Sequence, residues 1–268
     1  MRLTCYSVNT TLTLSSELTS NATFAAEARH QYDTERRGPY TTPGGDFLLF
    51  LPLSTYTNAS AAIHATALAS NASVSLPPGA PDEVAKGYAA SYDSLNSKLR
   101  AKDSAFLEVI WGEGPLLLVL QHPYSRGSVK AASNSMFDAP VADAGFLRNP
   151  LDTMLLREAV RFSRQLVAQP SIAALNPFEA VPGANVTSDT DIDQFVRQSA
   201  STLWHPAGSC RMGKRETGGV VDGQLKVYGI EGLRIVDASV FPMLPASHTM
   251  TTVYAVAEKA ADIIKASR

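Results

Sequence analysis

The sequence predicts an α+β fold in which an antiparallel sheet is flanked by helices. Three apolar runs of strand type follow one another closely, at residues 106–111, 116–121 and 128–132. The short turns between them favour antiparallel pairing, because a parallel connection needs a dozen or more residues. Longer segments with helical spacing lie on both sides of these runs, and 268 residues are enough to bury a sizeable core.

The elements before the three strands are expected in a simple order. Residues 17–37 have the spacing of a helix, and residues 47–53 form a short strand that Pro52 interrupts. A polar loop rich in Ala, Ser and Asn is expected over 54–80, and a moderately amphipathic helix over 83–99.

Helices dominate the region after the three strands. They are expected over 152–167 and 189–199, and a final apolar helix over 253–264, which Ser247 or Thr249 could cap. A short strand is expected at 233–236, where it ends in a polar turn. A strand, a polar turn and a helix N-terminus together suit a partly anionic ligand.

The composition argues against several classes of partner. The chain is 45% hydrophobic and 18% charged, with a formal net charge of −2. This balance gives no basic surface for nucleic acid or an anionic membrane. No apolar run approaches the roughly 20 residues that span a bilayer. The five histidines show no metal-ligand spacing, no Gly-x-Ser-x-Gly is present, and two cysteines make no disulfide framework.

The most informative stretch begins at residue 204. Trp-His-Pro-Ala-Gly-Ser-Cys-Arg-Met-Gly occupies residues 204–213, and Gly-Val-Val-Asp follows at 219–222. Gly-Leu-Arg-Ile-Val-Asp-Ala-Ser stands at 232–239, and Ser-His-Thr-Met-Thr at 247–251. His205 precedes a proline, which favours extended backbone, and the glycines that follow allow close approach to a flat ligand.

These motifs closely resemble the C-terminal signature of the glucose–methanol–choline (GMC) flavoprotein oxidoreductases. Two further motifs, Pro-x-Ser-x-Gly-x-Val at 123–129 and Asn-Pro-x-Asp at 149–152, also resemble that family. The second histidine and its Ser-His-x-Met-Thr context are similar to the fungal glucose oxidase and aryl-alcohol oxidase branch. The resemblance implies an FAD cofactor and oxidation of the CH–OH group of an alcohol or sugar.

The resemblance also implies an organisation into parts. The Gly-x-Gly-x-x-Gly turn that binds the dinucleotide is absent from the sequence. The chain therefore resembles a C-terminal half, for which a missing N-terminal FAD-binding half is the expected partner. Residues 1–20 would be left over from the connection to the flavin domain, and 21–200 would form the substrate-binding domain. Residues 201–268 would carry the catalytic histidine segment and the C-terminal strand and helix of the flavin domain.

Two histidines are the catalytic candidates that the resemblance implies. His205 would be the base that takes the hydroxyl proton, and His248 would hold the substrate oxygen and share that proton. A neutral imidazole suits this chemistry, because its ordinary pKa is about 6.5. A histidine before a proline can instead be a satisfied structural residue. Trp204 could line the substrate pocket beside the base, or could simply pack.

The resemblance assigns flavin contacts to residues near the second histidine. The ribityl–phosphate region of the flavin would be contacted by Asp237 and Ala238. The pyrimidine end of the isoalloxazine would be contacted by Thr249, Met250 and Val253, at a helix N-terminus that stabilises negative charge. Asp237 could alternatively be a strand-end or capping carboxylate.

The chain also contains five N-glycosylation sequons, at Asn9, Asn21, Asn58, Asn71 and Asn185. Composition alone would give roughly one or two. This excess favours a secreted parent protein, although a Thr- and Ser-rich chain can produce sequons by chance. No signal peptide is recognisable at the N-terminus. As a functional alternative, the chain could be a truncated, inactive fragment that cannot bind FAD alone.

Overall fold

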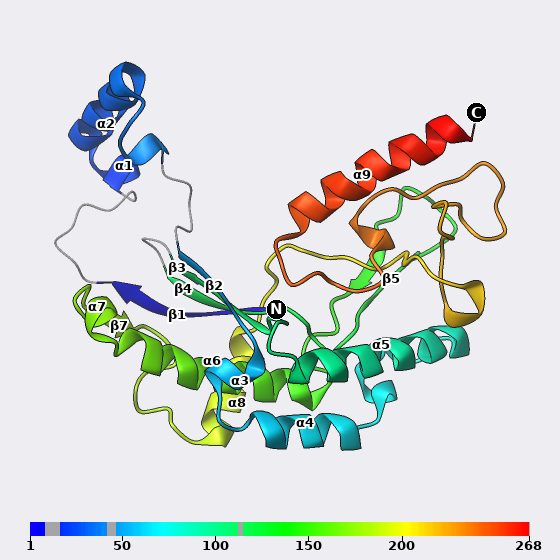
Figure 1. Ribbon diagram of the computed structural model, residues 1–268, viewed down its shortest axis with the longest axis horizontal. Helices are drawn as coiled ribbons and strands as arrows, with labels where there is room; N and C mark the ends of the chain where they lie inside the picture. Colours follow the sequence, from blue (N-terminus) through cyan, green and yellow to red (C-terminus); the bar gives the residue numbers. More distant parts are fainter. Residues whose placement is uncertain (9–16, 42–46, 112–114, 268) are drawn as a thin grey trace.

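The computed structural model describes residues 1–8, 17–41, 47–111 and 115–267 (Figure 1). Its main feature is a five-stranded antiparallel sheet in the order β2-β3-β4-β1-β7. The strands of this sheet are β1 (Arg2–Val8), β2 (Phe47–Leu51), β3 (Leu107–Trp111), β4 (Leu116–Leu120) and β7 (Pro177–Glu179). The expected α+β class with an antiparallel sheet flanked by helices is confirmed.

The two adjacent strands β3 and β4 form the most buried part of the sheet. Leu107 pairs with Leu120 and Val109 with Leu118, and all four side chains are buried. Alternate residues of a strand point to the same face, so these side chains contribute to one core. The apolar runs at 106–111 and 116–121 are therefore strands, as expected.

The strand β1 was not anticipated. It lies between β4 and β7, within the sheet, although residues 1–20 were expected to be left over from a connection to another domain. Leu3 and Cys5 are buried from one side of the strand. The alternation at these positions was the available signal, but the pairing with β4 and β7 is what identifies the strand.

Helices cover one side of the sheet (Figure 1). The long helices there are α5 (Asp82–Arg100), α6 (Pro150–Val167) and α8 (Asp189–Ser199), and α6 packs against β4 and α8. Helix α6 begins two residues before its expected start, because Pro150 occupies its first turn and the Asn149 side chain accepts the N–H of Leu151 at 2.9 Å.

The loop expected over 54–80 is largely helical, so that expectation is wrong. It contains α3 (Leu53–Tyr56), α4 (Ser60–Ala69) and the 3₁₀ turn η2 (Ala72–Ser75). Alanine is the best helix former, and Ile63 and Ala67 of α4 are buried where the helix packs against α5 and α6. Tertiary packing therefore selects the helix in a segment whose polar residues suggested a loop.

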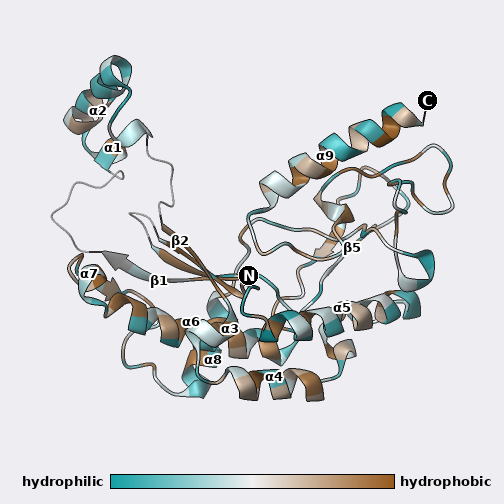
Figure 2. Cartoon of the chain, in the orientation of Figure 1, coloured by the Kyte–Doolittle hydropathy of each residue, from teal (hydrophilic) through white to brown (hydrophobic). Residues whose placement is uncertain are grey.

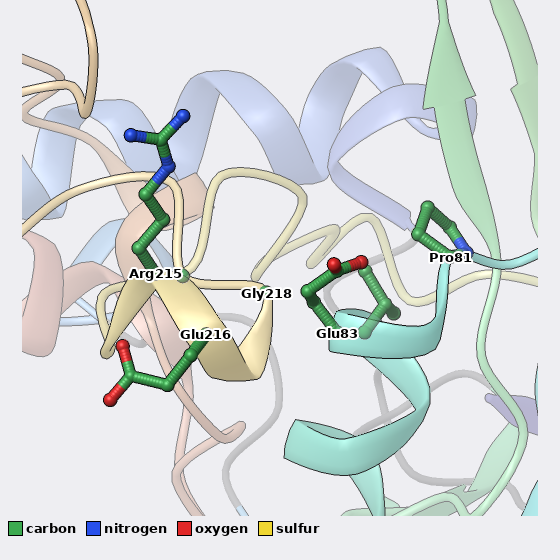
Figure 3. Close-up of a pocket in the computed structure, with 7 residues that line it drawn as sticks. Pro81, Glu83, Arg215, Glu216 and Gly218 are labelled. Atoms are coloured by element: carbon green, nitrogen blue, oxygen red, sulfur yellow. The ribbon is translucent and has the colours of Figure 1, made fainter.

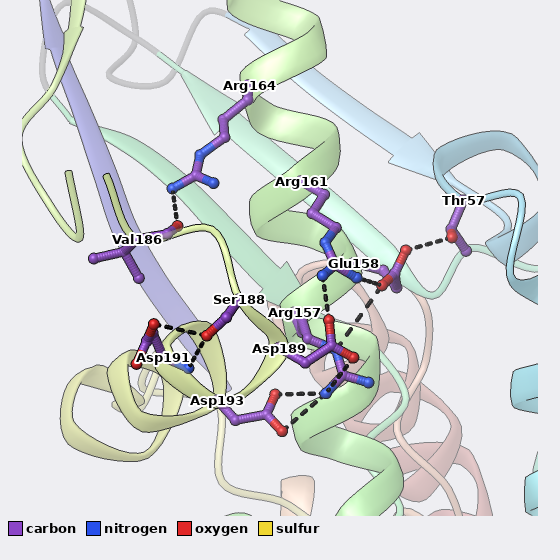
Figure 4. A network of polar contacts seen from close by, with 10 residues as sticks. All are labelled: Thr57, Arg157, Glu158, Arg161, Arg164, Val186, Ser188, Asp189, Asp191 and Asp193. Carbon is purple, nitrogen blue, oxygen red and sulfur yellow. Dashed lines mark hydrogen bonds and ion pairs between the residues drawn. The ribbon is translucent and has the colours of Figure 1, made fainter. Parts of the chain in front are cut away.

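Ion pairs hold α8 against α6 (Figure 4). Arg157 donates to both oxygens of Asp193 at 3.0 and 2.9 Å, and Arg161 bonds to Glu158 at 2.7 Å and to Asp189. Both bonds to Asp193 come from one guanidinium nitrogen, Nη1, and such charge-assisted bonds are roughly twice as strong as neutral ones. The network therefore sets the place at which α8 delivers the chain to the segment carrying His205.

The expected helix over 17–37 is divided in two. The short α1 (Glu17–Ser20) is followed directly by α2 (Ala22–Glu35). Between them stands Asn21, whose side chain accepts the N–H of Phe24 at 3.1 Å and caps α2. With the 3₁₀ turn η1 (Pro39–Thr41), these helices lie apart from the rest of the molecule (Figure 1).

The C-terminal third packs around a second, smaller core. Its regular elements are the 3₁₀ turns η3 (Arg215–Thr217) and η4 (Ala238–Val240) and the helix α9 (Thr249–Ala266). The hairpin of β5 (Ser128–Lys130) and β6 (Val141–Asp143) and the short helix α7 (Pro170–Ala173) precede it in the chain. The core is formed by Val221, Leu225, Val240, Phe241 and, from α9, Ala260.

Two expectations about this region are corrected. Residues 233–236 form no regular strand: the one ladder contact there is a single bridge between Arg234 and Lys226. A strand needs a continuous neighbour, which the described residues do not supply at this place. Helix α9 begins at Thr249 and has no side-chain cap, so neither Ser247 nor Thr249 caps it. Among the described residues, no helix has the length and apolarity needed to cross a bilayer.

Candidate active site

The two candidate catalytic histidines lie side by side. Their ring centroids are 5.7 Å apart and the rings are inclined at 59°. Two neighbours set the direction of the His205 side chain. Trp204, before it, has a left-handed backbone conformation at φ 58°, and Pro206, after it, favours an extended backbone at His205. His248 is the residue immediately before α9. The structure therefore brings together two imidazoles that come from distant parts of the chain.

A buried carboxylate that sequence analysis missed holds the second histidine. Glu108 of β3 is fully buried, and its Oε1 lies 2.7 Å from Nε2 of His248. The side-chain amide of Gln121 donates to the other carboxylate oxygen. A single acidic residue inside a buried apolar strand was a usable signal, because a buried charge needs a partner.

This contact links the tautomer of His248 to the charge of Glu108. When Glu108 is ionised, it accepts hydrogen bonds and donates none, so Nε2 of His248 is then the donor. In the neutral imidazole the other nitrogen, Nδ1, is then the free acceptor. His248 can therefore accept a proton at Nδ1 while Glu108 stabilises the resulting positive charge.

A large cavity lies beside the histidines. Its volume is about 1150 Å³, and His205, Asp237, Ala238 and Thr249 line it. Trp204 does not line it: its side chain is 69% exposed, with the Arg2 guanidinium 4.6 Å above the ring. Four of the residues expected at the site therefore share one cavity.

The other two expected flavin contacts lie elsewhere on α9. Met250 is exposed, and Val253 packs against the second core. Asp237 does act as a capping carboxylate, because its side chain accepts the N–H of Ser239 at 2.7 Å at the start of η4. Asp237 therefore both caps a turn and lines the cavity, so the two roles suggested for it are compatible.

The cavity fits one end of a flavin. The first turn of α9 has N–H groups with no side-chain cap, and the positive end of this 18-residue helix favours negative charge. Thr249, its first residue, reaches the cavity wall. Thr249, Asp237 and Ala238 would hold FAD there. No group of three or more metal-ligating side chains occurs among the described residues.

A second histidine in the cavity wall, which His248 does not line, predicts a pH dependence of stability. Burial lowers the pKa of His122 to about 4, and the charges of Lys98 and Arg126 act in the same direction. Between pH 6.5 and about 4 the unfolded chain binds a proton that the folded chain does not. The free energy of unfolding therefore decreases as the pH is lowered through this range. We expect His122 to contribute a loss of about 3 kcal/mol across this window.

Urea unfolding at pH 7 and at pH 4 measures this contribution. The difference between the two pH values should shrink in His122→Gln and stay unchanged in His30→Gln, whose side chain is exposed. An equal pH dependence in the two variants would contradict the assignment to His122.

A second hollow, of about 630 Å³, lies between the start of α5 and η3 (Figure 3). Pro81, Glu83, Arg215 and Glu216 line it, and the side chains of Arg215 and Glu216 point in different directions. Neither histidine of the pair lines this hollow. The larger cavity is therefore the candidate active site.

Comparison with known proteins decides the family. The family model described as GMC oxidoreductase matches residues 123–257, which is half of the chain. This chain belongs to the GMC oxidoreductase family. Among curated relatives of this GMC chain, the GMC oxidoreductase family protein Mala s 12 of Malassezia sympodialis is 37% identical over 185 residues. That alignment covers 68% of this chain and 30% of the relative.

Other relatives are similar over shorter stretches. The dehydrogenase pkfF of Emericella nidulans is 44% identical over 57% of the GMC chain and 25% of its own length. An oxygen-dependent choline dehydrogenase of Chromohalobacter salexigens is 40% identical over 53% of the chain and 25% of its own length.

Solved structures match nearly the whole GMC chain. An FAD-dependent oxidoreductase from Chaetomium thermophilum superposes with a TM-score of 0.92 and 32% identity, covering 99% of this chain and 47% of that one. A fungal aryl-alcohol oxidase gives a TM-score of 0.85 and 36% identity, covering 98% and 46%. The chain thus spans a quarter to a third of these curated relatives and less than half of these solved structures.

Proposed function

We propose that this chain supplies the catalytic histidine pair of an FAD-dependent oxidoreductase that oxidises the CH–OH group of an alcohol or sugar. The observation that carries the proposal is the pairing of His205 and His248, 5.7 Å apart, beside a cavity with a helix N-terminus in its wall. The solved relatives that match include an FAD-dependent oxidoreductase and an aryl-alcohol oxidase, which supports this reaction class.

The residues of this chain handle the proton of the substrate. His205 lines the cavity and takes the hydroxyl proton as the alcohol carbon is oxidised. His248 holds the substrate oxygen or shares the proton, and with Glu108 ionised its Nδ1 is the nitrogen available for this. FAD, when bound, accepts the hydride that leaves the carbon.

The missing part of the flavin site must come from outside this chain. Thr249, Asp237 and Ala238 would hold the flavin end, but the sequence contains no Gly-x-Gly-x-x-Gly turn for the dinucleotide. An N-terminal FAD-binding half is therefore the proposed partner, and a small alcohol or sugar the proposed substrate. Met250 and Val253 would contribute through α9 and not through the cavity wall.

A chimera tests this function. In the chimera, residues 1–268 replace the matching part of the fungal aryl-alcohol oxidase; the match covers 98% of this chain and 46% of that one. We expect the purified chimera to show flavin absorbance that bleaches when an alcohol is added without oxygen. A chimera that retains flavin but is reduced by none of a panel of aryl, aliphatic and sugar alcohols would overturn the proposal.

A second candidate function is an inactive fragment that cannot bind FAD by itself. It is favoured by the exposure of Met250 and Tyr254 on α9, each 68% exposed, which leaves part of this helix without a partner. Flavin absorbance of the chimera distinguishes the two, with the purified chain alone, mixed with free FAD, as the reference. Under the proposed function the chain alone stays colourless and the chimera is yellow, whereas a true fragment leaves both colourless.

Glu108→Gln is expected to lower kcat of the chimera by roughly ten- to a hundred-fold, with a smaller change in KM. The neutral amide loses the charge-assisted bond to His248 and can present either its oxygen or its NH₂ group to the ring. Steady-state kinetics measures both constants. Glu83→Gln, the same change at an exposed position, is the control and should leave both constants unchanged. Equal kinetics in the two variants would remove Glu108 from the site.

The parent protein is proposed to follow the secretory route. Four of the five sequons lie among the described residues, and the asparagines at 21, 58, 71 and 185 are all exposed. The sequon at Asn9 lies outside the described residues. Surface exposure is what glycosylation in a secreted protein requires.

A further inference from the structure

The outer side of α4 and the turn after it form an uncharged, apolar surface. No Asp, Glu, Lys or Arg occurs from residue 47 to residue 81. Figure 1 places α4 at the edge of the molecule away from α9, and Figure 2 shows apolar residues along it. The exposed apolar residues of this uncharged surface are Ala61, Ala62, Ala65, Leu68, Ala69 and Val74, and Thr66 and Ser73 are exposed among them.

The uncharged surface is not part of the core. Leu68 is 63% exposed and Val74 is 47% exposed, whereas Ile63 and Ala67 on the other side of α4 are buried against α5 and α6. Soluble proteins normally intersperse charges on their surfaces, and a contiguous apolar patch without them promotes association. A hydrophilic group attached near α4 is therefore expected to cover this surface.

Two sequons bracket the uncharged surface. Asn58 lies two residues before the start of α4, and Asn71 two residues after its end, and both are exposed. The Oδ1 atom of Asn71 accepts the N–H of Ser73 at 2.9 Å, which leaves its Nδ2 for attachment. Both asparagines are thus exposed, and at Asn71 the bond to Ser73 uses only the amide oxygen.

Asparagines with a packing role lie outside the sequon pattern. Asn149 is fully buried and its Nδ2 donates to Ser75 at 2.8 Å, and the buried Asn96 accepts from the Tyr124 hydroxyl at 3.0 Å. Neither is followed by Ser or Thr two positions later. The sequons at the ends of α4 therefore fall where a glycan fits, and the buried amides are not sequons.

We propose that Asn58 and Asn71 carry N-linked glycans that cover the uncharged surface of α4 and keep the protein from associating through it. In the attachment step, Nδ2 bonds to C1 of an oligosaccharide carried on a lipid diphosphate. The C1–O bond to the diphosphate breaks, the diphosphate leaves with the electron pair, and Nδ2 loses one proton. The inference rests on the proposed secretory route and is independent of the proposed catalysis.

The test uses the full chain, secreted from yeast behind an appended leader, with secreted and cell-retained material both analysed. Peptide N-glycosidase converts each glycosylated asparagine to aspartate, so peptide mass mapping identifies the sites. We expect conversion at Asn58 and Asn71. Ser60→Ala and Ser73→Ala should each abolish one site while keeping the asparagine and, at position 71, its backbone contact. The exposed Ser54→Ala is the matched control and should change neither.

A second measurement tests the covering role. The folded, glycosylated chain is treated with an endoglycosidase that leaves one N-acetylglucosamine on each asparagine, so that neither a failure to fold nor a new aspartate charge enters, and its monomer fraction is followed by size-exclusion chromatography. We expect the monomer fraction to fall at least twofold. Unmodified Asn58 and Asn71 peptides would overturn the sites, and a deglycosylated chain that stays monomeric would overturn the covering role. Flavin absorbance of the chimera reports separately on the proposed catalysis.

Discussion

Replacing His205 by alanine in the chimera lowers kcat by roughly 10²–10⁴-fold, if this side chain is the base that we propose. The imidazole lines the cavity, and His248, at 5.7 Å between ring centroids, is already engaged with Glu108 through one nitrogen. His248 therefore cannot replace the missing base without giving up its own contact with the substrate oxygen.

The measurement separates the loss of a base from the loss of the cofactor. Flavin absorbance of His205→Ala should match that of the unaltered chimera, while the rate of flavin bleaching by alcohol falls. His30→Ala, at an exposed position on α2, is the matched control and should retain the full rate. An unchanged bleaching rate in His205→Ala would remove this residue from the reaction.

The second large effect is on stability. Asp152 is fully buried in the first turn of α6, where its two carboxylate oxygens accept the N–H groups of Tyr124 and Ser125 at 2.7 and 2.9 Å. Asp152→Ala leaves both buried N–H groups without a partner. Each such group costs about 1–3 kcal/mol, so we expect the free energy of unfolding to fall by about 2–6 kcal/mol.

Guanidinium unfolding of the full chain measures this change. Asp152→Asn, which keeps one acceptor oxygen, should lose roughly half as much. Asp93→Ala on the exposed side of α5 is the control, with an expected change within about 0.5 kcal/mol. A loss in Asp152→Ala no larger than in this control would show that the two backbone bonds contribute little.

The elements that were predictable are those whose pattern is local. The strands β3 and β4 and the helices α5, α6 and α8 show their periodicity in the sequence, and the motif around His205 and His248 is contiguous enough to indicate a shared site. The pairing of the two rings agrees with that expectation. The catalytic roles themselves stay predictions.

What was missed depends on contacts between distant residues. The strand β1 is defined by its neighbours β4 and β7, and α4 by burial of Ile63 and Ala67. Glu108 meets His248 across 140 positions of the chain. The expected strand at 233–236 failed for the opposite reason, because a β-branched run without an adjacent strand forms one bridge.

The bond between Glu108 and His248 ties the centre of the sheet to the first residue before α9. Substitutions that reshape β3 would thus move the imidazole of His248, although no residue of β3 lines the cavity. If the proposed function is correct, a substitution in β3 would therefore alter the position of His248, and with it the rate of proton transfer, without touching the cavity wall.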